Sequence, residues 1–350
     1  MKQLGLLRYL SVFTLPALAY ISFTSEGWIT FLPLVEAFAL IPLLELFFKP
    51  NPANFSEEEE KSRLKNWFYD LLIYLVVPVQ FIWLWLFLES MTQPNIDLIT
   101  IIGRVSAMGL LCGVMGINVA HELGHRKKKY EQFMAKMLLM TSLYMHFFIE
   151  HNRGHHKNVS TDEDPSSARF GESLYSFWIR SVSQAYLSAW HLEFERLNKK
   201  DFGKLSWRNE MLQFQIVQGL FVLLVYLVFG WAIAGYFVLA AIIGFLLLET
   251  VNYIEHYGLS RDKQGARYER VMPQHSWNSD HVVGRMMLFE LSRHSDHHYI
   301  ASRKYQVLRH MDDSPQMPTG YPGMMLLAVV PPLWFKVMNS KINIFKKTFS

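Results

Sequence analysis

Long apolar runs divide this 350-residue chain. A helix needs about 20 apolar residues to cross about 30 Å of hydrocarbon, because each residue adds about 1.5 Å. A helix also satisfies its own backbone hydrogen bonds in lipid, so the runs predict an all-α integral membrane protein. The six predicted transmembrane helices cover about residues 7–24, 28–48, 68–88, 98–120, 212–229 and 232–251.

The composition agrees with a membrane protein. Hydrophobic residues make up 51% of the chain and charged residues only 18%, whereas about a quarter of a soluble domain is charged. The single cysteine, Cys112, excludes an internal disulfide and a thiolate metal cluster. We find no glycine-rich phosphate loop and no nucleic-acid-binding motif. We therefore expect membrane lipid, and no nucleic acid, among the partners.

Basic residues are distributed unevenly between the loops. The N-terminal segment carries Lys2 and Arg8, and the loops after the second and fourth predicted helices are also basic. The loops after the first, third and fifth predicted helices contain no Lys or Arg. The positive-inside rule therefore places both termini in the cytoplasm. We expect one membrane-embedded domain, residues 1–350, with cytoplasmic segments at 121–211 and 252–350.

Several other segments need separate interpretations. The stretch 17–19 imitates a signal-peptide cleavage site, but the apolar run continues beyond it, so we expect no cleavage. Residues 133–149 look like a further span, and we interpret them as a buried or partly inserted helix that returns to the same side. Residues 324–338 contain two prolines and are too short to cross. Ser56, followed by four glutamates, predicts the start of a helix.

Nine of the fourteen histidines fall in four short clusters. Residues four apart on a helix share a face, so His121 and His125 can point at one metal ion, and His151 and His155 repeat the spacing. Adjacent imidazoles diverge by about 100° on a helix, enough to reach a second ion. Imidazole suits iron, copper, zinc and nickel, and nine nitrogens exceed the capacity of one ion. The nine candidate ligands are His121, His125, His151, His155, His156, His256, His294, His297 and His298.

Five carboxylates lie close to these clusters in the sequence. They can orient the imidazoles by accepting hydrogen bonds from the second ring nitrogen. The candidates are Glu122, Glu150, Asp164, Glu255 and Asp296.

Two other interpretations of the histidines stay open. His121 to His125 also fits the zinc-protease pattern H-E-x-x-H, with Glu122 as the base, but such a site needs only three ligands. The second alternative is that histidines at a membrane edge bind no metal. That alternative is favoured for the isolated His146, His191 and His310.

The longer motifs around the histidines resemble a known family. They are residues 150–169, 252–259, 275–279, 291–298 and 318–323. In these motifs the chain is similar to the integral-membrane non-haem diiron enzymes, and among them to the alkane 1-monooxygenases. One departure is the run 299–302, where relatives often carry an Ala-His-Pro-like sequence.

The resemblance implies a six-span helical protein with two iron ions held by all nine histidines. It also implies hydroxylation of the terminal methyl of medium- to long-chain n-alkanes by O2. The electrons would come from rubredoxin, with rubredoxin reductase upstream, and the membrane would be the bacterial inner membrane. The diiron centre itself is expected to be catalytic, with no separate protein base.

Alternatives to this function come from different classes. The nearest is a xylene-type or other hydrocarbon monooxygenase. A fatty-acid desaturase or hydroxylase is further away, because its substrate carries a polar head. The non-enzyme alternative is a membrane protein that stores metal.

The resemblance also implies two recognition features. In this family a bulky side chain on the second span can close the far end of the substrate tunnel, and Ala37 stands at that place here. An alanine there predicts that chains beyond about C12 are accepted; the alternative is a lipid-facing or helix-packing alanine. Electron-donor docking is predicted at basic residues, although the positive-inside rule alone also explains the lysines. These residues are Arg126, Lys127, Lys128, Lys129, Arg303, Lys304 and Arg309.

Overall fold

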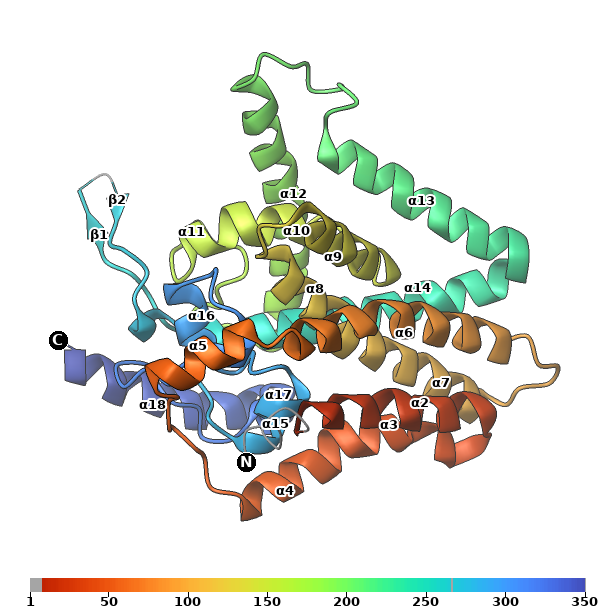
Figure 1. Ribbon diagram of the computed structural model, residues 1–350, viewed down its shortest axis with the longest axis horizontal. Coiled ribbons are helices and arrows are strands. Elements are labelled where there is room, and N and C mark those ends of the chain that lie inside the picture. The colour runs from red at the N-terminus through yellow and green to blue at the C-terminus, as the bar shows by residue number, and fades with distance from the viewer. Residues whose placement is uncertain (1–7, 266, 350) are drawn as a thin grey trace. The chain divides into compact units, whose positions relative to one another are not determined.

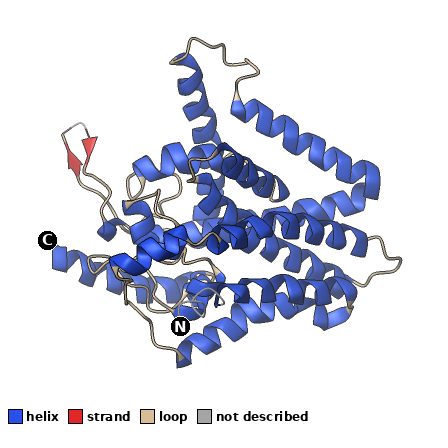
Figure 2. Cartoon of the chain, viewed as in Figure 1, coloured by secondary structure: helices blue, strands red, loops and turns tan. Residues whose placement is uncertain are grey.

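The computed structural model describes residues 8–265 and 267–349. Helices dominate this part of the chain, and its strands form one short antiparallel hairpin, drawn red in Figure 2. The strands are β1 (Lys263–Gln264) and β2 (Arg267–Tyr268). The all-α prediction is therefore confirmed.

Five helical stretches in the described part of the chain are long and apolar enough to cross a membrane. Each overlaps one of the predicted spans, which supports a membrane protein. In chain order they consist of η2 (Gly27–Phe31), α3 (Leu32–Val35), η3 (Glu36–Leu40) and α4 (Ile41–Phe47); α6 (Phe68–Ser90); α7 (Leu98–Leu111), η4 (Cys112–Ile117) and α8 (Asn118–Gly124); α13 (Glu210–Phe229); and α14 (Trp231–His256).

The remaining predicted span lies near the N-terminus. There the chain forms η1 (Arg8–Phe13), a 3₁₀-helix, followed by α2 (Thr14–Thr24). α2 has 11 residues, which extend about 17 Å and cannot cross the hydrocarbon alone. Lys2 and Leu7, which also belong to this prediction, lie outside the described residues. The count of six spans stays a prediction.

The chain folds into two compact units, each built from separate stretches. The first unit contains the described residues up to 39 together with 66–152 and 186–248. The second unit contains 40–65, 153–185 and the described residues from 249 onward. The prediction of one membrane-embedded domain stays a prediction.

In the first unit, α2, α6 and α7 lie side by side (Figure 1). Arg104 in α7 is almost fully buried, and its guanidinium donates to the carbonyl oxygens of Ser90 and Ser25. These bonds satisfy helix-end carbonyls that lipid cannot. A Cβ on Gly109 would lie 2.5 Å from Cγ2 of Ile243, so α7 approaches α14 closely at this glycine.

The segment that joins α8 to the second histidine cluster is not one continuous helix. It forms α9 (Lys129–Thr141) and α10 (Phe147–Glu150), separated by a turn in which Leu143 has a φ of 50°. The ring centroids of His121 and His151 are only 4.5 Å apart. The segment therefore begins and ends beside the same histidines, and its return to the same side of the membrane stays a prediction.

The second unit has a core of aromatic and aliphatic side chains around Tyr253, Tyr257 and Trp277. The C-terminal helix buries Trp334, with Met338 and Ile342 following at intervals of four residues, in that core. The helices of the second unit are α4, α5 (Glu57–Lys65), the end of η5 (His151–His155), α11 (His156–Asn158), the first part of α12 (Leu174–Asn198), the end of α14, η6 (Pro273–His275), α15 (Val282–Met287), α16 (His294–Tyr299), η7 (Tyr305–Val307), α17 (Tyr321–Ala328) and α18 (Pro331–Phe349). α17 ends before the two prolines and α18 begins with them, so the broken run 324–338 is confirmed.

Candidate metal centre

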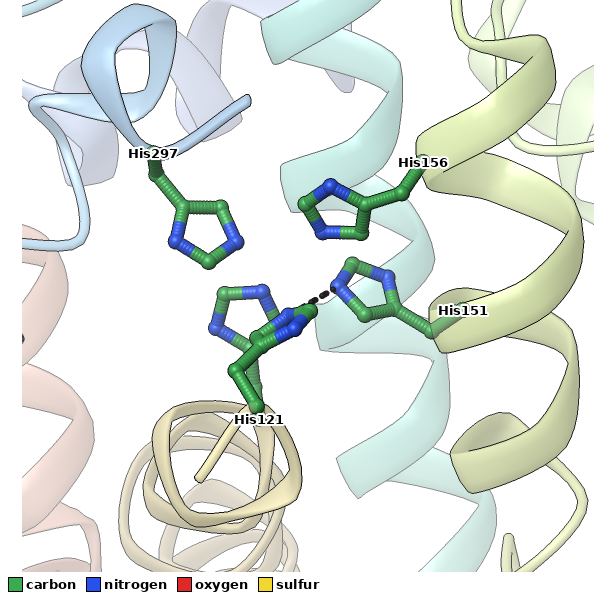
Figure 3. Close-up of side chains that lie close together, drawn as sticks. His121, His151, His156 and His297 are labelled. Atoms are coloured by element: carbon green, nitrogen blue, oxygen red, sulfur yellow. Dashed lines mark hydrogen bonds between the residues drawn. The ribbon is translucent and has the colours of Figure 1, made fainter. Parts of the chain in front are cut away.

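Three histidines of the first unit converge. His121 lies in α8, His125 directly follows that helix, and His151 opens η5. Nε2 of His125 lies 3.0 Å from Nε2 of His151, and the ring of His121 lies 5.0 Å from that of His125 and 4.5 Å from that of His151. Figure 3 shows His121 and His151 with their rings turned toward one another.

Four histidines of the second unit form a separate, fully buried group. Their ligand nitrogens all lie within 4.8 Å of one another. Nε2 of His155 is 3.2 Å from Nε2 of His298, and Nε2 of His256 is 3.2 Å from Nε2 of His294. We call His155, His256, His294 and His298 the four-histidine group.

The last two clustered histidines, His156 and His297, also belong to the second unit. Their ring centroids are 5.0 Å apart, and both are labelled in Figure 3. His156 additionally stacks on His298, with 4.4 Å between ring centroids.

A π-helical turn over residues 151–155 changes the spacing that an α-helix predicts. Hydrogen bonds in a π-helix run from residue i to i+5, so side-chain directions across this turn differ from those in an α-helix. His155 accordingly turns to the four-histidine group, whereas His151 lies beside His121 and His125. The expectation that His151 and His155 repeat the pairing of His121 and His125 is therefore wrong.

The geometry of these groups fits a bound metal. Two nitrogens that bind one ion about 2.1 Å away at a right angle lie about 3.0 Å apart, close to the observed separations of 3.0–3.2 Å. Burial, followed by the neighbouring His294 and His156, lowers the pKa of His298 far below its usual value. A neutral imidazole keeps the lone pair that a metal needs. The histidine groups can therefore bind metal.

Asp164 and Glu255 each contact a clustered histidine directly. Oδ2 of Asp164 lies 2.9 Å from Nδ1 of His155. Burial opposes ionisation of Asp164, but the pKa of this carboxyl is lowered, and its hydrogen bonds with His155 and Ser167 contribute to that shift. Oε2 of Glu255 lies 3.1 Å from Nε2 of His294. This nitrogen also faces His256, so Glu255 does not approach His294 through the second ring nitrogen as expected.

Two further candidate carboxylates pair with arginines. Glu122 pairs with Arg126 at 2.6 Å. Asp296 accepts from Arg303 at 2.9 Å and from the backbone nitrogen of Arg309 at 2.8 Å. Burial raises the pKa of Asp296 despite these positive partners. Glu150 is buried at the end of α10.

The basic residues expected to dock a donor divide into two sets. Lys127, Lys128 and Lys129 are exposed. Arg126 is 7% exposed and contacts Asp70 at 3.2 Å as well as Glu122. Its guanidinium is therefore held inside the first unit, and the expectation of a docking role for Arg126 does not agree with its position.

Arg309, Lys304 and Ala37 lie in three different environments. Arg309 pairs with Glu60 at 2.6 Å, and Lys304 is half-buried beside η7. Ala37 is buried in η3 whereas Ala39 is exposed, so the lipid-facing alternative for Ala37 is excluded.

The three isolated histidines have ordinary surroundings. His146 is buried against Tyr144, and His191 lies on the surface of α12 beside Glu195. His310 bonds Asp280 at 2.6 Å. None of the three belongs to a metal-binding group within residues 8–265 and 267–349.

Sequence reasoning missed two residues beside the site. Tyr321 donates its hydroxyl to Oε1 of Glu255 at 2.6 Å, and Arg293, which precedes His294, is completely buried against Asp280. Tyr321 stands in the recognised motif 318–323, but that motif gave no sign of a contact 66 residues away.

Comparisons with known proteins agree with this site. A family model described as fatty acid desaturase matches residues 98–327, which is more than half of the chain and includes all nine clustered histidines. The match defines the class as the fatty acid desaturase family.

Individual relatives define the family more closely. Alkane 1-monooxygenase 2 of Pseudomonas aeruginosa is 43% identical over 88% of this chain and 82% of its own length. Alkane 1-monooxygenase 2 of Alcanivorax borkumensis is 36% identical over 99% of this chain and 92% of its own length. The chain belongs to the alkane 1-monooxygenase family. The hydroxylase component of xylene/toluene monooxygenase from Pseudomonas putida is more distant, at 28% identity over 95% of this chain and 87% of its own length.

Proposed function

We propose that this protein is a membrane non-haem diiron monooxygenase that hydroxylates the terminal methyl of medium- to long-chain n-alkanes to 1-alcohols, using O2. The observation that carries the proposal is the buried four-histidine group, in a chain 43% identical to an alkane 1-monooxygenase. Buried imidazoles without thiolates suit iron.

Two iron ions are proposed, each with its own histidines. One is held by the four-histidine group. The family resemblance implies that the other clustered histidines, His156 and His297 among them, hold the second ion. Bound iron would supply the activation of O2.

The protein's own groups prepare the site for this chemistry. Asp164 contacts the ring of His155, and every member of the four-histidine group is buried. The apolar helices let an alkane arrive from the bilayer, where it dissolves. Ala37 is proposed to leave the far end of the tunnel open. We assign no protein general base.

Electrons are proposed to come from rubredoxin, which receives them from rubredoxin reductase. The exposed Lys127, Lys128 and Lys129 are the main candidates for docking an acidic donor. Arg303, Lys304 and Arg309 are proposed as a second basic area. Arg126 is assigned instead to holding Glu122 and Asp70.

We place the protein in the bacterial inner membrane, with both termini and the histidines on the cytoplasmic side. The distribution of Lys and Arg between the loops supports this orientation. The complete chain is proposed to act as one membrane-embedded hydroxylase domain.

Conversion by whole cells tests the function. Cells that express the protein with rubredoxin should convert octane or hexadecane to the 1-alcohol, and the His294→Ala variant should not. His191→Ala provides a matched control, because His191 lies on the exposed surface of α12.

The likeness to the xylene/toluene monooxygenase component makes a xylene-type hydrocarbon monooxygenase the second candidate. Xylene and a long-chain fatty acid should therefore be offered in parallel. Conversion of xylene alone would favour the second candidate, and desaturation of the fatty acid would favour a desaturase. Iron binding without conversion of any substrate would favour metal storage.

A further inference from the structure

Glu45 is a buried carboxylate of the second unit that the proposed reaction does not use. It lies near the end of α4, and only 5% of its surface is exposed. Its Oε1 accepts a hydrogen bond from the backbone nitrogen of Gly284 in α15, 2.9 Å away. The described residues provide no hydrogen-bond partner for Oε2. A buried oxygen without a partner is destabilising, so its presence needs an explanation.

Two glycines make room for this carboxylate. A Cβ on Gly284 would lie 2.9 Å from Oε1 of Glu45, which is closer than real Cβ atoms approach. A Cβ on Gly320 would overlap both carboxylate oxygens. Gly320 directly precedes α17, so the Glu45 carboxylate is packed between α15 and the start of α17.

The start of α17 is connected to the four-histidine group. Its first residue, Tyr321, is 1% exposed and donates its hydroxyl to Oε1 of Glu255 at 2.6 Å. Oε2 of Glu255 lies 3.1 Å from Nε2 of His294. Direct contacts therefore lead from Glu45 through Gly320 and Tyr321 to a histidine of the group.

We propose that Glu45 is a positioning residue for the four-histidine group. Its carboxylate fixes the start of α17. The contacts of Tyr321 with Glu255 and of Glu255 with His294 then hold the His294 ring in place. The consequence for metal binding rests on the proposed function. The attachment of α17 to α4 is a property of the folded chain and is tested independently of any metal.

Substitutions at both ends of the contact test the attachment. Glu45→Ala removes the carboxylate, and Gly320→Ala places a methyl group where the carboxylate lies. Each should accelerate hydrogen–deuterium exchange of residues 318–330. Each should also weaken cobalt(II) binding by about tenfold, the lower end of the effect of residues that support metal ligands.

The double variant gives the sharpest comparison. Glu45→Ala/Gly320→Ala should bind cobalt(II) more tightly and exchange more slowly than Gly320→Ala alone, because the added methyl then fills the vacated space. Glu45→Gln keeps an acceptor for Gly284 and should remain close to wild type.

Tyr321→Phe tests the connection to the metal. It should weaken cobalt(II) binding while leaving the exchange of α15 unchanged. Adding Glu45→Ala to Tyr321→Phe should then cause little further loss of cobalt(II) affinity, because both substitutions interrupt the same series of contacts to His294.

Two controls match the substitutions chemically. A Cβ on Gly235 meets nothing within 4 Å, and Glu89 is an exposed carboxylate at the end of α6. Gly235→Ala and Glu89→Ala should leave cobalt(II) binding and exchange unchanged.

Wild-type exchange in Gly320→Ala, or a double variant no better than Gly320→Ala, would overturn the proposal. Faster exchange with unchanged cobalt(II) affinity would also overturn the positioning role. If the wild-type protein itself bound no cobalt(II), the diiron assignment would fail, whereas the exchange comparison would still decide whether Glu45 fixes α17.

Discussion

Nδ1 of His155 lies 2.9 Å from Oδ2 of Asp164, and at most 1% of either side chain is exposed. The hydroxyl of Ser167 donates to the same carboxylate oxygen at 2.6 Å. This arrangement places the ring proton on Nδ1 and leaves the Nε2 lone pair directed at His298. The carboxylate therefore prepares His155 to bind metal through Nε2.

Removing this carboxylate charge should weaken metal binding. We expect Asp164→Asn to lower iron affinity by about 10- to 100-fold, because residues that orient a ligand have effects of this size. The measurement is iron content after dialysis against increasing concentrations of a chelator. Asp162→Asn, two residues away and exposed, is the control. Equal iron retention in both variants would contradict the role of Asp164.

The histidine clusters could be found from the sequence, but their division between groups could not. The i, i+4 rule assumes α-helical hydrogen bonding. Residues 151–155 instead form a π-turn, which changes the direction of the following side chains. Such turns are rare and occur mostly as single turns within α-helices, so an i, i+4 pattern does not reveal them. The sequence therefore predicted His151 and His155 as candidate ligands while pairing them wrongly.

Contacts between residues close in the sequence could be predicted, whereas contacts between distant residues could not. The start of α5 was predicted because Ser56 and Glu59 make reciprocal capping bonds three residues apart. The burial of Arg126 was not predicted, because its partner Asp70 lies 56 residues earlier. The contact of Tyr321 with Glu255 was missed for the same reason.

Substitution of individual histidines should separate the two proposed ions. We expect His256→Ala and His121→Ala each to lower bound iron and to abolish hydroxylation, because each removes a nitrogen from a different group. Iron per chain is measured by mass spectrometry, beside His191→Ala, which should retain wild-type iron. Full iron occupancy in His256→Ala would remove that residue from the proposed ligands.

Charge reversal should distinguish the exposed lysines from Arg126. A Lys127→Glu/Lys128→Glu/Lys129→Glu variant should lower kcat/KM for rubredoxin by about tenfold or more at low salt, with a smaller effect at high salt. Arg126→Ala should instead destabilise the fold by about 3–5 kcal/mol, because it removes one partner of the largely buried Arg126–Glu122 ion pair.

The control for the lysines is Arg267→Glu, an exposed site on β2. Steady-state kinetics at several salt concentrations is the measurement. If the triple variant has unchanged kcat/KM for rubredoxin at low salt, the lysines reflect only membrane orientation.

Acid should destabilise the protein through His146. Burial lowers the pKa of His146 to about 3. Above the unfolded value of about 6.5 both states are neutral, but between about pH 6.5 and 3 only the unfolded state binds the proton. This difference favours unfolding by about 2 kcal/mol at pH 5, at about 1.4 kcal/mol per pH unit.

A variant that cannot titrate should lose this contribution. We expect the apparent Tm of His146→Phe to fall less than that of wild type between pH 7 and pH 5. His191→Phe, at an exposed site, should follow the wild-type curve. Identical pH dependence of the Tm in wild type and His146→Phe would show that His146 does not remain neutral in the fold.

Substrate length should depend on the second span. Ala37 is buried in the π-helical turn η3, whereas Ala39 is exposed, so only Ala37 can face an internal tunnel. A methylene that moves from water into an apolar site gains roughly 0.8 kcal/mol. An alkane in the bilayer is already in an apolar medium, so most of this gain is absent when it enters the tunnel. Steric exclusion must therefore limit the length of the chain.

Ala37→Trp should consequently shorten the range of accepted alkanes without changing bound iron. We expect hexadecane turnover to fall strongly while octane turnover is retained, because the indole fills the far end of the tunnel and the methyl-binding end stays unchanged. Ala39→Trp is the matched control, since its side chain points to the exposed face and should leave both turnovers unaltered. A parallel loss of octane and hexadecane turnover would indicate disturbed helix packing, and equal hexadecane turnover in wild type and Ala37→Trp would place the tunnel end elsewhere.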